Sequence, residues 1–349
     1  MAVEVSLSKP SIRDVAREAG VGVGTVSRVL NHDLRVSEAT RNRVAEVIRQ
    51  LGYTPDLAAR ALRSRRTNTL GVLLPLFTRH FYVEVLREIE EAIAPTPYSL
   101  TIFSLERASD RPQRIEHCTS HGHVDGMLVI SLTLTDREVA RFRSADMPIV
   151  LLDSAYPGVS GVELDHLNSA YQAVAHLASL GHKRVALVDR PQDAFSPDRI
   201  SDRWHGYLKA CHDYGLDPIP EYRLMGEYSR ASGKSSAERL LSLPQPPTAI
   251  FTGSDLQALG VLEAARERGL TVPDDLSVMG YHDIQLAEYV GLTTVRLPTV
   301  DLGRMAVEML TTLIAERGSD PVTRRVIGTL VTRSTTGPPP SLQKHASAP

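Results

Sequence analysis

The sequence predicts an all-α head joined to an α/β core of two doubly wound subdomains. Residues 11–51 place apolar side chains at helical spacing in three short segments. From Leu70 onward, short β-branched runs alternate with amphipathic stretches, which is typical of parallel sheets covered on both faces. These runs are too many for one small sheet, and 349 residues exceed one ordinary core. We therefore expect two subdomains with a cleft between them.

Local signals set the bounds of the three head helices. Ser11, with Asp14 three positions later, forms a capping-box-like start for the first helix. The second helix is expected from about Val23 to Leu30, after a glycine-rich break. Ser37 caps the third helix, which ends at Gly52, because glycine is favoured directly after a helix end.

Seven apolar runs are expected to form the strands of the core. They are Leu70–Leu74, Leu100–Ser104, Met127–Ile130, Ile149–Leu152, Val185–Val188, Ala249–Thr252 and Leu276–Met279. The helical stretches between most of them include 82–94, 166–180, 202–214, 231–242 and 255–268. Ligands in such folds bind beyond the carboxyl ends of the strands, so we expect a ligand site there.

The chain is expected to divide into four parts. Residues 1–54 form the helical head, and residues 55–68 form a short helix and linker. This helix is too short to be stable alone in water. Residues 69–335 form the core, and residues 336–349, with their run of prolines, form a disordered tail.

Charge is unevenly divided along the chain. Residues 1–66 carry 12 Lys and Arg against 7 Asp and Glu, whereas residues 67–349 carry 27 against 34. A basic head on an acidic body is expected when only the head approaches phosphate groups. A solvated basic face would have the same composition, so charge alone leaves both interpretations open.

Cysteine content and hydropathy indicate a cytoplasmic protein. Cys118 and Cys211 are too few for a disulfide framework, which favours a reducing compartment. The N-terminus has no basic segment followed by an apolar one, so no secretory signal is expected. No apolar run approaches the ~18 residues that a membrane span requires, so no membrane partner is expected.

A long stretch of the sequence resembles the lactose/galactose repressor (LacI/GalR) family. It reads SIRDVAREAGVGVGTVSRVLNHDLRVSEATRNRVAEVIRQLGYTPDLAARALRSRRTNTLGVLLP without a gap. Further landmarks in the core are SLGHKRVALV, SDLQALGVLEAARERGLTVPDDLSVMGYHD and GLTTVRLP. The resemblance implies a homodimer with an N-terminal helix-turn-helix domain, a hinge helix at residues 55–68, and a periplasmic-binding-protein-like core.

For the head, the resemblance implies contacts with double-stranded DNA at a near-palindromic operator. The residues at matching positions are Ser11, Ile12, Val23, Gly24, Thr25, Ser27, Arg28, Asn31, Arg35, Tyr53, Ala59 and Leu62. Arg28 can donate two hydrogen bonds to a guanine, a pairing worth roughly 1–3 kcal/mol of discrimination. Gly24 offers no side chain for base contact, and Leu62 is expected to insert between base pairs in the minor groove. The alternatives are a solvated Arg28 and a Leu62 that packs on the core.

For the core, the resemblance implies a small-molecule effector, a sugar or sugar derivative. The effector-binding residues carried over from the family are Phe81, Tyr82, Ser131, Asp153, Arg203, Tyr228, Asp255 and His282. The family commonly has Asp at the position of His282. Imidazole in place of an anionic acceptor leaves room for an anionic or phosphorylated ligand, or for altered sugar specificity. The alternative interpretation is that each of these eight residues is an ordinary cleft or core residue with no role in effector binding.

The resulting hypothesis is a repressor of genes for carbohydrate uptake or catabolism, without a cofactor or metal. A secreted sugar-binding module and an enzyme are the competing classes. The head and the lack of a signal peptide argue against the first, and no motif in the sequence forms a persuasive catalytic arrangement for the second. The segment Ser232–Ser235 is similar to a phosphate-binding loop but lacks its first glycine. His117, Cys118, His121 and His123 have metal-ligand composition, but their spacing matches no standard zinc pattern. Whether a ligand acts as inducer or corepressor stays open.

Overall fold

The chain divides into two units, residues 1–67 and residues 68–349, called here the head and the core. The computed structural model describes residues 10–30, 33, 35–53, 66–120, 123–191, 195 and 200–340. Among these residues, no helix combines the length and the apolar composition needed to cross a membrane.

The described part of the head contains three short helices. They are α1 (Ile12–Glu18), α2 (Val23–Leu30) and α3 (Glu38–Leu51). Asp14 and Ser11 form the expected capping box, and Ser37 Oγ accepts a hydrogen bond from the Thr40 amide. Gly52 ends α3 with a φ of 61°, a conformation that glycine adopts without strain. The predicted helix bounds in the head are confirmed.

One valine from each helix forms the centre of the head. Val15 of α1, Val26 of α2 and Val44 of α3 are completely buried. Burying a valine stabilises the fold by about 1.5–3 kcal/mol. This shared cluster holds the three short helices together, because none is long enough to be stable alone.

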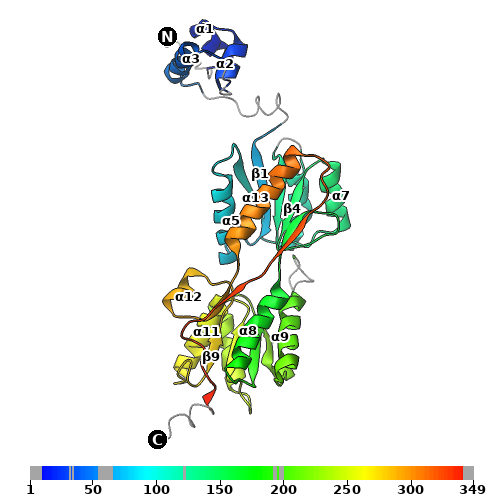
Figure 1. Ribbon diagram of the computed structural model, residues 1–349, viewed down its shortest axis with the longest axis vertical. Helices are drawn as coiled ribbons and strands as arrows, with labels where there is room; N and C mark the ends of the chain where they lie inside the picture. The colour runs from blue at the N-terminus through cyan, green and yellow to red at the C-terminus, as the bar shows by residue number, and fades with distance from the viewer. Residues whose placement is uncertain are drawn as a thin grey trace, which may run out of the picture. The chain divides into compact units, whose positions relative to one another are not determined.

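The first core subdomain is a six-stranded parallel sheet with helices on both faces. Its strands are β1 (Thr69–Pro75), β2 (Ser99–Leu105), β3 (Gly126–Ile130), β4 (Ile149–Leu152), β5 (Gly161–Leu164) and β11 (Thr323–Val326), in the order β11-β5-β4-β3-β1-β2. Its helices are α5 (His80–Ile93), α6 (Arg111–Cys118), α7 (Asp136–Ser144) and α13 (Thr299–Ala315), with a 3-10 turn at Ala108–Asp110. Figure 1 shows α5 and α13 side by side on one face of this sheet.

The second core subdomain is built around a four-stranded parallel sheet. Its strands are β6 (Val185–Asp189), β7 (Arg223–Met225), β8 (Ala249–Thr252) and β9 (Ser277–Met279), in the order β7-β6-β8-β9. Its helices are α8 (His166–Ser179), α9 (Ile200–Tyr214), α10 (Arg230–Leu241), α11 (Asp255–Glu267) and α12 (Gln285–Tyr289), with a 3-10 turn at Pro220–Tyr222. An antiparallel ribbon of β10 (Thr294–Arg296) and β12 (Thr329–Val331) packs against α8.

Within the described residues, the chain crosses between the two subdomains three times. It passes from β5 to α8, returns from β10 to α13, and passes again from β11 to β12. Figure 1 shows the last crossing as the red segment that runs from the first subdomain into the second. Each subdomain is therefore assembled from segments that are distant in the sequence.

The predicted architecture of two doubly wound subdomains is confirmed, but several short strands were not predicted. β11 has the sequence TRRV and lies exposed at the sheet edge, so it lacks the continuous apolar pattern of a central strand. β7 and β12 contain only three residues each. Such segments become strands because a neighbouring strand offers them backbone partners, which the sequence alone does not reveal.

The expectation of a disordered tail from Thr336 is wrong for residues 336–340. The Gly337 amide donates to Ser277 Oγ at 3.0 Å, and the Gly337 carbonyl lies 2.9 Å from His182 Nε2. Gly337 and Pro339 are buried. The prolines do not cause disorder here, because an extended backbone suits proline and the side chains of the core supply its hydrogen bonds. Residues 341–349 lie outside the described residues.

Candidate DNA-binding head and effector cavity

Helix α2 presents one face to solvent and the other to the core of the head. Val26 and Val29 are buried, whereas Val23, Gly24 and Arg28 are exposed. A Cβ placed on Gly24 would meet only Arg28 Nη2, at 3.9 Å. The outward face therefore offers one long side chain, Arg28, beside the open backbone of Gly24.

The remaining predicted DNA-contacting residues of the head differ in exposure, and three of them lie outside the described residues. Thr25, Ser27, Ile12 and Tyr53 are half-buried, and Ser11 and Arg35 are exposed. Asn31, Ala59 and Leu62 lie outside the described residues.

Two exposed residues of the head are already engaged by carboxylates. Ser11 Oγ donates to Asp14 Oδ2 at 2.7 Å. Arg35 Nη2 lies 2.8 Å from Asp33 Oδ2, and hydrogen bonds from Arg35 lower the pKa of Asp33 to about 2. A phosphate that approached Arg35 would therefore compete with a fully ionised carboxylate.

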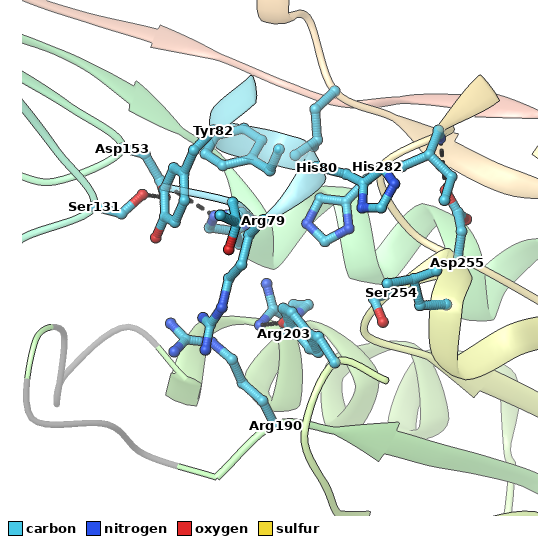
Figure 2. Close-up of a pocket in the computed structure, with 17 residues that line it drawn as sticks. Arg79, His80, Tyr82, Ser131, Asp153, Arg190, Arg203, Ser254, Asp255 and His282 are labelled. Carbon is cyan, nitrogen blue, oxygen red and sulfur yellow. Dashed lines mark hydrogen bonds and ion pairs between the residues drawn. The ribbon is translucent and has the colours of Figure 1, made fainter. Parts of the chain in front are cut away.

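In the core, all eight predicted effector residues line one cavity between the two subdomains. The cavity has a volume of about 290 Å³ and lies beyond the carboxyl ends of the strands (Figure 2). Ser131 follows β3, Asp153 follows β4, and His282 lies just after β9. Their φ angles of 49°, 51° and 104° turn the backbone where each strand ends. The cavity thus lies where the strand-end rule placed a ligand site, and the residues carried over from the family line it.

A chain of buried hydrogen bonds crosses from the first subdomain to the second. Ser131 Oγ donates to Asp153 Oδ2 at 2.6 Å, and Asp153 Oδ1 lies 3.0 Å from His166 Nε2. His166 Nδ1 lies 2.8 Å from the hydroxyl of Tyr281. The first two residues belong to the first subdomain and the last two to the second. A ligand that contacts Ser131 or Asp153 therefore also touches the junction between the subdomains.

Arg203 is held rigidly at the cavity by a buried carboxylate. Its Nη2 lies 3.0 Å from Asp189 Oδ1 and donates to the Tyr228 hydroxyl at 2.6 Å. Burial alone would lower the pKa of Arg203, but the carboxylate of Asp189 outweighs burial and raises this pKa well above its ordinary value. Burial raises the pKa of Tyr228 to about 12. This end of the cavity thus contains a permanent cation and a neutral phenol.

Asp255 and His282 are two cavity residues whose charge burial suppresses. Asp255 accepts hydrogen bonds from Thr294 Oγ1 at 2.6 Å and from the Ile284 amide at 2.8 Å. Burial nevertheless raises the pKa of Asp255 to about 7. Burial, and then the positive charge of Arg203, lower the pKa of His282 to about 3, so its imidazole is neutral.

Three rings form an aromatic wall of the cavity. Measured between ring centroids, Phe81 lies 5.9 Å and Tyr228 lies 5.8 Å from His282. Tyr82, also one of the predicted effector residues, is buried beside Phe81, and the centroids of the two rings lie 5.4 Å apart. Such a wall can pack against the flat face of a sugar ring or a heterocycle.

Comparison with known proteins places this geometry in a family. Residues 11–56 match the family described as "Bacterial regulatory proteins, lacI family", and residues 174–336 match the "Periplasmic binding protein-like domain". Catabolite control protein A of Priestia megaterium is 35% identical over 305 residues, which cover 86% of this chain and 91% of that protein. The chain belongs to the LacI family of bacterial regulatory proteins.

Other members of the LacI family agree over nearly the whole chain. The ribose operon repressor of Escherichia coli (strain K12) is 35% identical over 306 residues, covering 86% of this chain and 92% of that protein. The lac repressor dimer, solved with operator and the anti-inducer ONPF, matches with a TM-score of 0.82 and 26% identity. That match covers 95% of this chain and 100% of the solved one. The resemblance inferred from the sequence is confirmed.

Four ionisable residues that line this cavity were not predicted from the sequence. Arg79 and His80 stand at the start of α5, Arg190 directly follows β6, and His166 begins α8. A usable signal was present for Arg190, because it follows the end of a parallel strand just as Ser131 and Asp153 do. Arg79 and His80 stood five and six residues beyond the predicted first strand and carried no such signal.

The two other sequence motifs lie outside this cavity. The Ser232–Ser235 segment is part of helix α10, and its Lys234 pairs with Glu263 at 3.1 Å and with Glu267 at 2.7 Å. The rings of His117 and His123 lie 4.9 Å apart. His121 lies outside the described residues, and among the described ones no group of three or more metal-ligating side chains gathers.

Proposed function

We propose that this chain is a sequence-specific DNA-binding repressor of genes for carbohydrate uptake or catabolism. A small-molecule effector bound in the core cavity sets its affinity for the operator. The observation that carries this proposal is the combination of an exposed recognition-helix face with a cavity lined by residues from both core subdomains.

The head residues are proposed to divide between base contact and phosphate contact. Arg28, exposed on α2, is the candidate for bidentate contact with a guanine, and Val23, Gly24 and Thr25 lie beside it. Ser11, Thr25, Ser27, Asn31 and Tyr53 are proposed for the phosphate backbone, and Ile12 and Arg35 for positions beside the bases. Ala59 and Leu62 are proposed for the minor groove on the family resemblance alone.

The core residues are proposed to bind the effector. Arg203, Asp153 and Asp255 offer polar contacts, and Phe81 and Tyr228 offer ring faces. Tyr82, Ser131 and His282 complete the set. The ribose operon repressor and the lac repressor, relatives by sequence and structure, carry names that refer to sugars, which supports a sugar or sugar derivative.

Coupling between effector and DNA is proposed to use the junction between the subdomains. The cavity contacts both subdomains, and the Ser131-Asp153-His166-Tyr281 chain crosses between them. A ligand that favours one relative orientation of the subdomains shifts the population toward it. We further propose that the protein acts as a homodimer and is located in the cytoplasm, where a repressor meets its operator. It acts by binding DNA and effector, without catalysis.

The test is to select bound sequences from a random DNA library with purified full-length protein. A near-palindromic consensus is expected, mirroring the two-fold axis of a dimer. Fluorescence anisotropy on the consensus duplex then follows whether added sugars and sugar derivatives change its affinity. Enrichment of no sequence over the starting library would reject the proposed function.

A further inference from the structure

We propose that Asp33 is a positioning residue for base recognition. It holds the guanidinium of Arg35 for two hydrogen bonds to a guanine and cancels the charge that would draw Arg35 to phosphate. This inference rests on the proposed function, since it adds a residue to the same DNA-binding head. It follows from which edge of the guanidinium the carboxylate occupies and from the burial of that carboxylate.

The carboxylate of Asp33 occupies one complete edge of the Arg35 guanidinium. Arg35 Nε donates to Asp33 Oδ1 at 3.0 Å, and Arg35 Nη2 donates to Asp33 Oδ2 at 2.8 Å. The Arg35 amide also donates to Oδ1 at 3.0 Å, so the backbone turn and the ion pair are tied together. Because a guanidinium is planar and rigid, fixing one edge also fixes the direction of the other.

The second edge of the guanidinium is not used by the protein. Nη1 and the second hydrogen of Nη2 make no hydrogen bond within the described residues, and the Arg35 side chain is 84% exposed. Two parallel N–H groups on one edge match the O6 and N7 acceptors of guanine. Asp33 therefore leaves to DNA the edge that can recognise a base.

The position of the carboxylate makes this pair different from an ordinary surface ion pair. The Asp33 side chain is only 19% exposed, and hydrogen bonds from Arg35 lower its pKa to about 2. The carboxylate is thus ionised at neutral pH, and the pair carries almost no net charge. Attraction to phosphate needs net charge, whereas hydrogen bonds to neutral base atoms need only N–H donors. Arg35 should therefore contribute base discrimination with little salt-dependent affinity.

Asp33 also stands next to the exposed face of α2. Its amide donates to the Arg28 carbonyl at 3.0 Å, and the positive charge of Arg28 contributes to the lowered pKa of Asp33. Arg28 itself makes no hydrogen bond or ion pair within the described residues. The head thus presents two neighbouring arginines of different kinds, one that keeps its charge and one whose charge a carboxylate balances.

The test uses full-length protein and the consensus duplex obtained by selection. Fluorescence anisotropy measures affinity for that duplex, for its single-base-pair variants and for a scrambled duplex, over a series of salt concentrations. The informative variant is Asp33→Asn, because its amide oxygen can still accept the hydrogen bond from the Arg35 amide while the charge is lost.

Asp33→Asn should tighten binding to the scrambled duplex and steepen the slope of log K against log salt concentration by about 0.9, the value of one added phosphate contact. Discrimination at one G·C pair of the consensus should fall by about fivefold or more, because the guanidinium is no longer held for that base. Asp301→Asn is the matched control. It removes the carboxylate of an exposed pair with Arg304 in the core and should change neither quantity.

Arg35→Lys tests the same idea with Asp33 in place. Lysine keeps the charge balance but not the two-edged fork, so discrimination should fall at the same G·C pair while the salt slope stays at the parent value.

Two outcomes would overturn the inference. Equal weakening of Asp33→Asn on consensus and scrambled duplexes, with an unchanged salt slope, would reduce Asp33 to a residue that only maintains the turn. Unchanged discrimination at every base pair in Arg35→Lys would remove Arg35 from base recognition. Failure of the proposed function is distinct from both, because the parent protein would then enrich no sequence at all.

Discussion

Arg203 and Asp189 form a two-point ion pair in which both side chains are almost completely buried. The guanidinium is 6% exposed and the carboxylate 1%. A Cβ placed on Gly253 would lie 2.5 Å from Asp189 Oδ1, so the backbone packs directly against this carboxylate and leaves it no room to move. The pair therefore fixes where the Arg203 charge stands at the cavity, and Tyr228 is positioned with it through a 2.6 Å hydrogen bond.

Asp189→Asn should destabilise the core by about 3–5 kcal/mol, because it leaves a buried guanidinium without its counter-charge. Urea unfolding measures the change in free energy. Asp301→Asn is the control, since Asp301 pairs with Arg304 on the exposed surface of α13 and its loss should cost about 0–1 kcal/mol. Equal effects of the two substitutions would show that burial of the Arg203 pair contributes nothing to stability.

Arg28→Ala should remove the preference for operator DNA while leaving much of the nonspecific affinity. Base contacts specify sequence and phosphate contacts position the protein, and a bidentate contact with guanine is worth roughly 1–3 kcal/mol. Fluorescence anisotropy on operator and scrambled duplexes measures both affinities at one salt concentration. A loss of equal size on the two duplexes would identify Arg28 as a phosphate contact.

Asp255→Asn should change how stability depends on pH. In the folded protein the pKa of Asp255 is about 7, above its ordinary value of 3.8, so the folded state holds this proton more tightly than the unfolded state. Its contribution to stability is complete below about pH 3.8 and is lost as pH rises to about 7. As pH rises between those values, the parent should lose stability relative to the variant. The difference between their unfolding free energies should change by at most about 1.4 kcal/mol per pH unit.

Urea unfolding of both proteins at pH 5, 6, 7 and 8 measures this shift. His176 and His182, whose pKa values burial lowers, act in the opposite direction. They are present in both proteins and cancel in the comparison. A parent–variant difference that stays constant over this range would contradict the raised pKa of Asp255.

The protein should be a dimer in solution, since the proposed operator is near-palindromic and the similar lac repressor structure is a dimer on its operator. Light scattering at micromolar concentration should give about twice the chain mass of 38.3 kDa. A mass of one chain or of four would contradict this prediction.

The sequence was most informative where one local pattern decides the structure. The capping residues Ser11 and Ser37 gave the starts of two head helices, and the continuous apolar runs gave the central strands. The edge strand Thr323–Val326 could not be predicted, because half of its four residues are arginines and its partner is 162 residues away. Local composition also misled at Thr336, where contacts with His176 and Thr293 order the chain.

The cavity shows the same division between local and distant information. Family positions gave eight of its residues, and all eight line it. The hydrogen-bonded chain from Ser131 to Tyr281 was not foreseen, because it depends on side chains from different strands and helices meeting in space. Arg203 could be assigned to the cavity from its position alone, but its neutralisation by Asp189 became visible only from their distance.

The three crossings of the chain also set the order in which the core can be completed during synthesis. Of the core, residues 68–164 leave the ribosome first, but α13 and β11, which finish the same subdomain, are made on the order of ten seconds later at typical translation rates. Until then, the face of β3, β4 and β5 that α13 covers lacks its partner helix. The core subdomain that begins first is therefore finished almost last, and its nascent sheet keeps an uncovered face until α13 has been made.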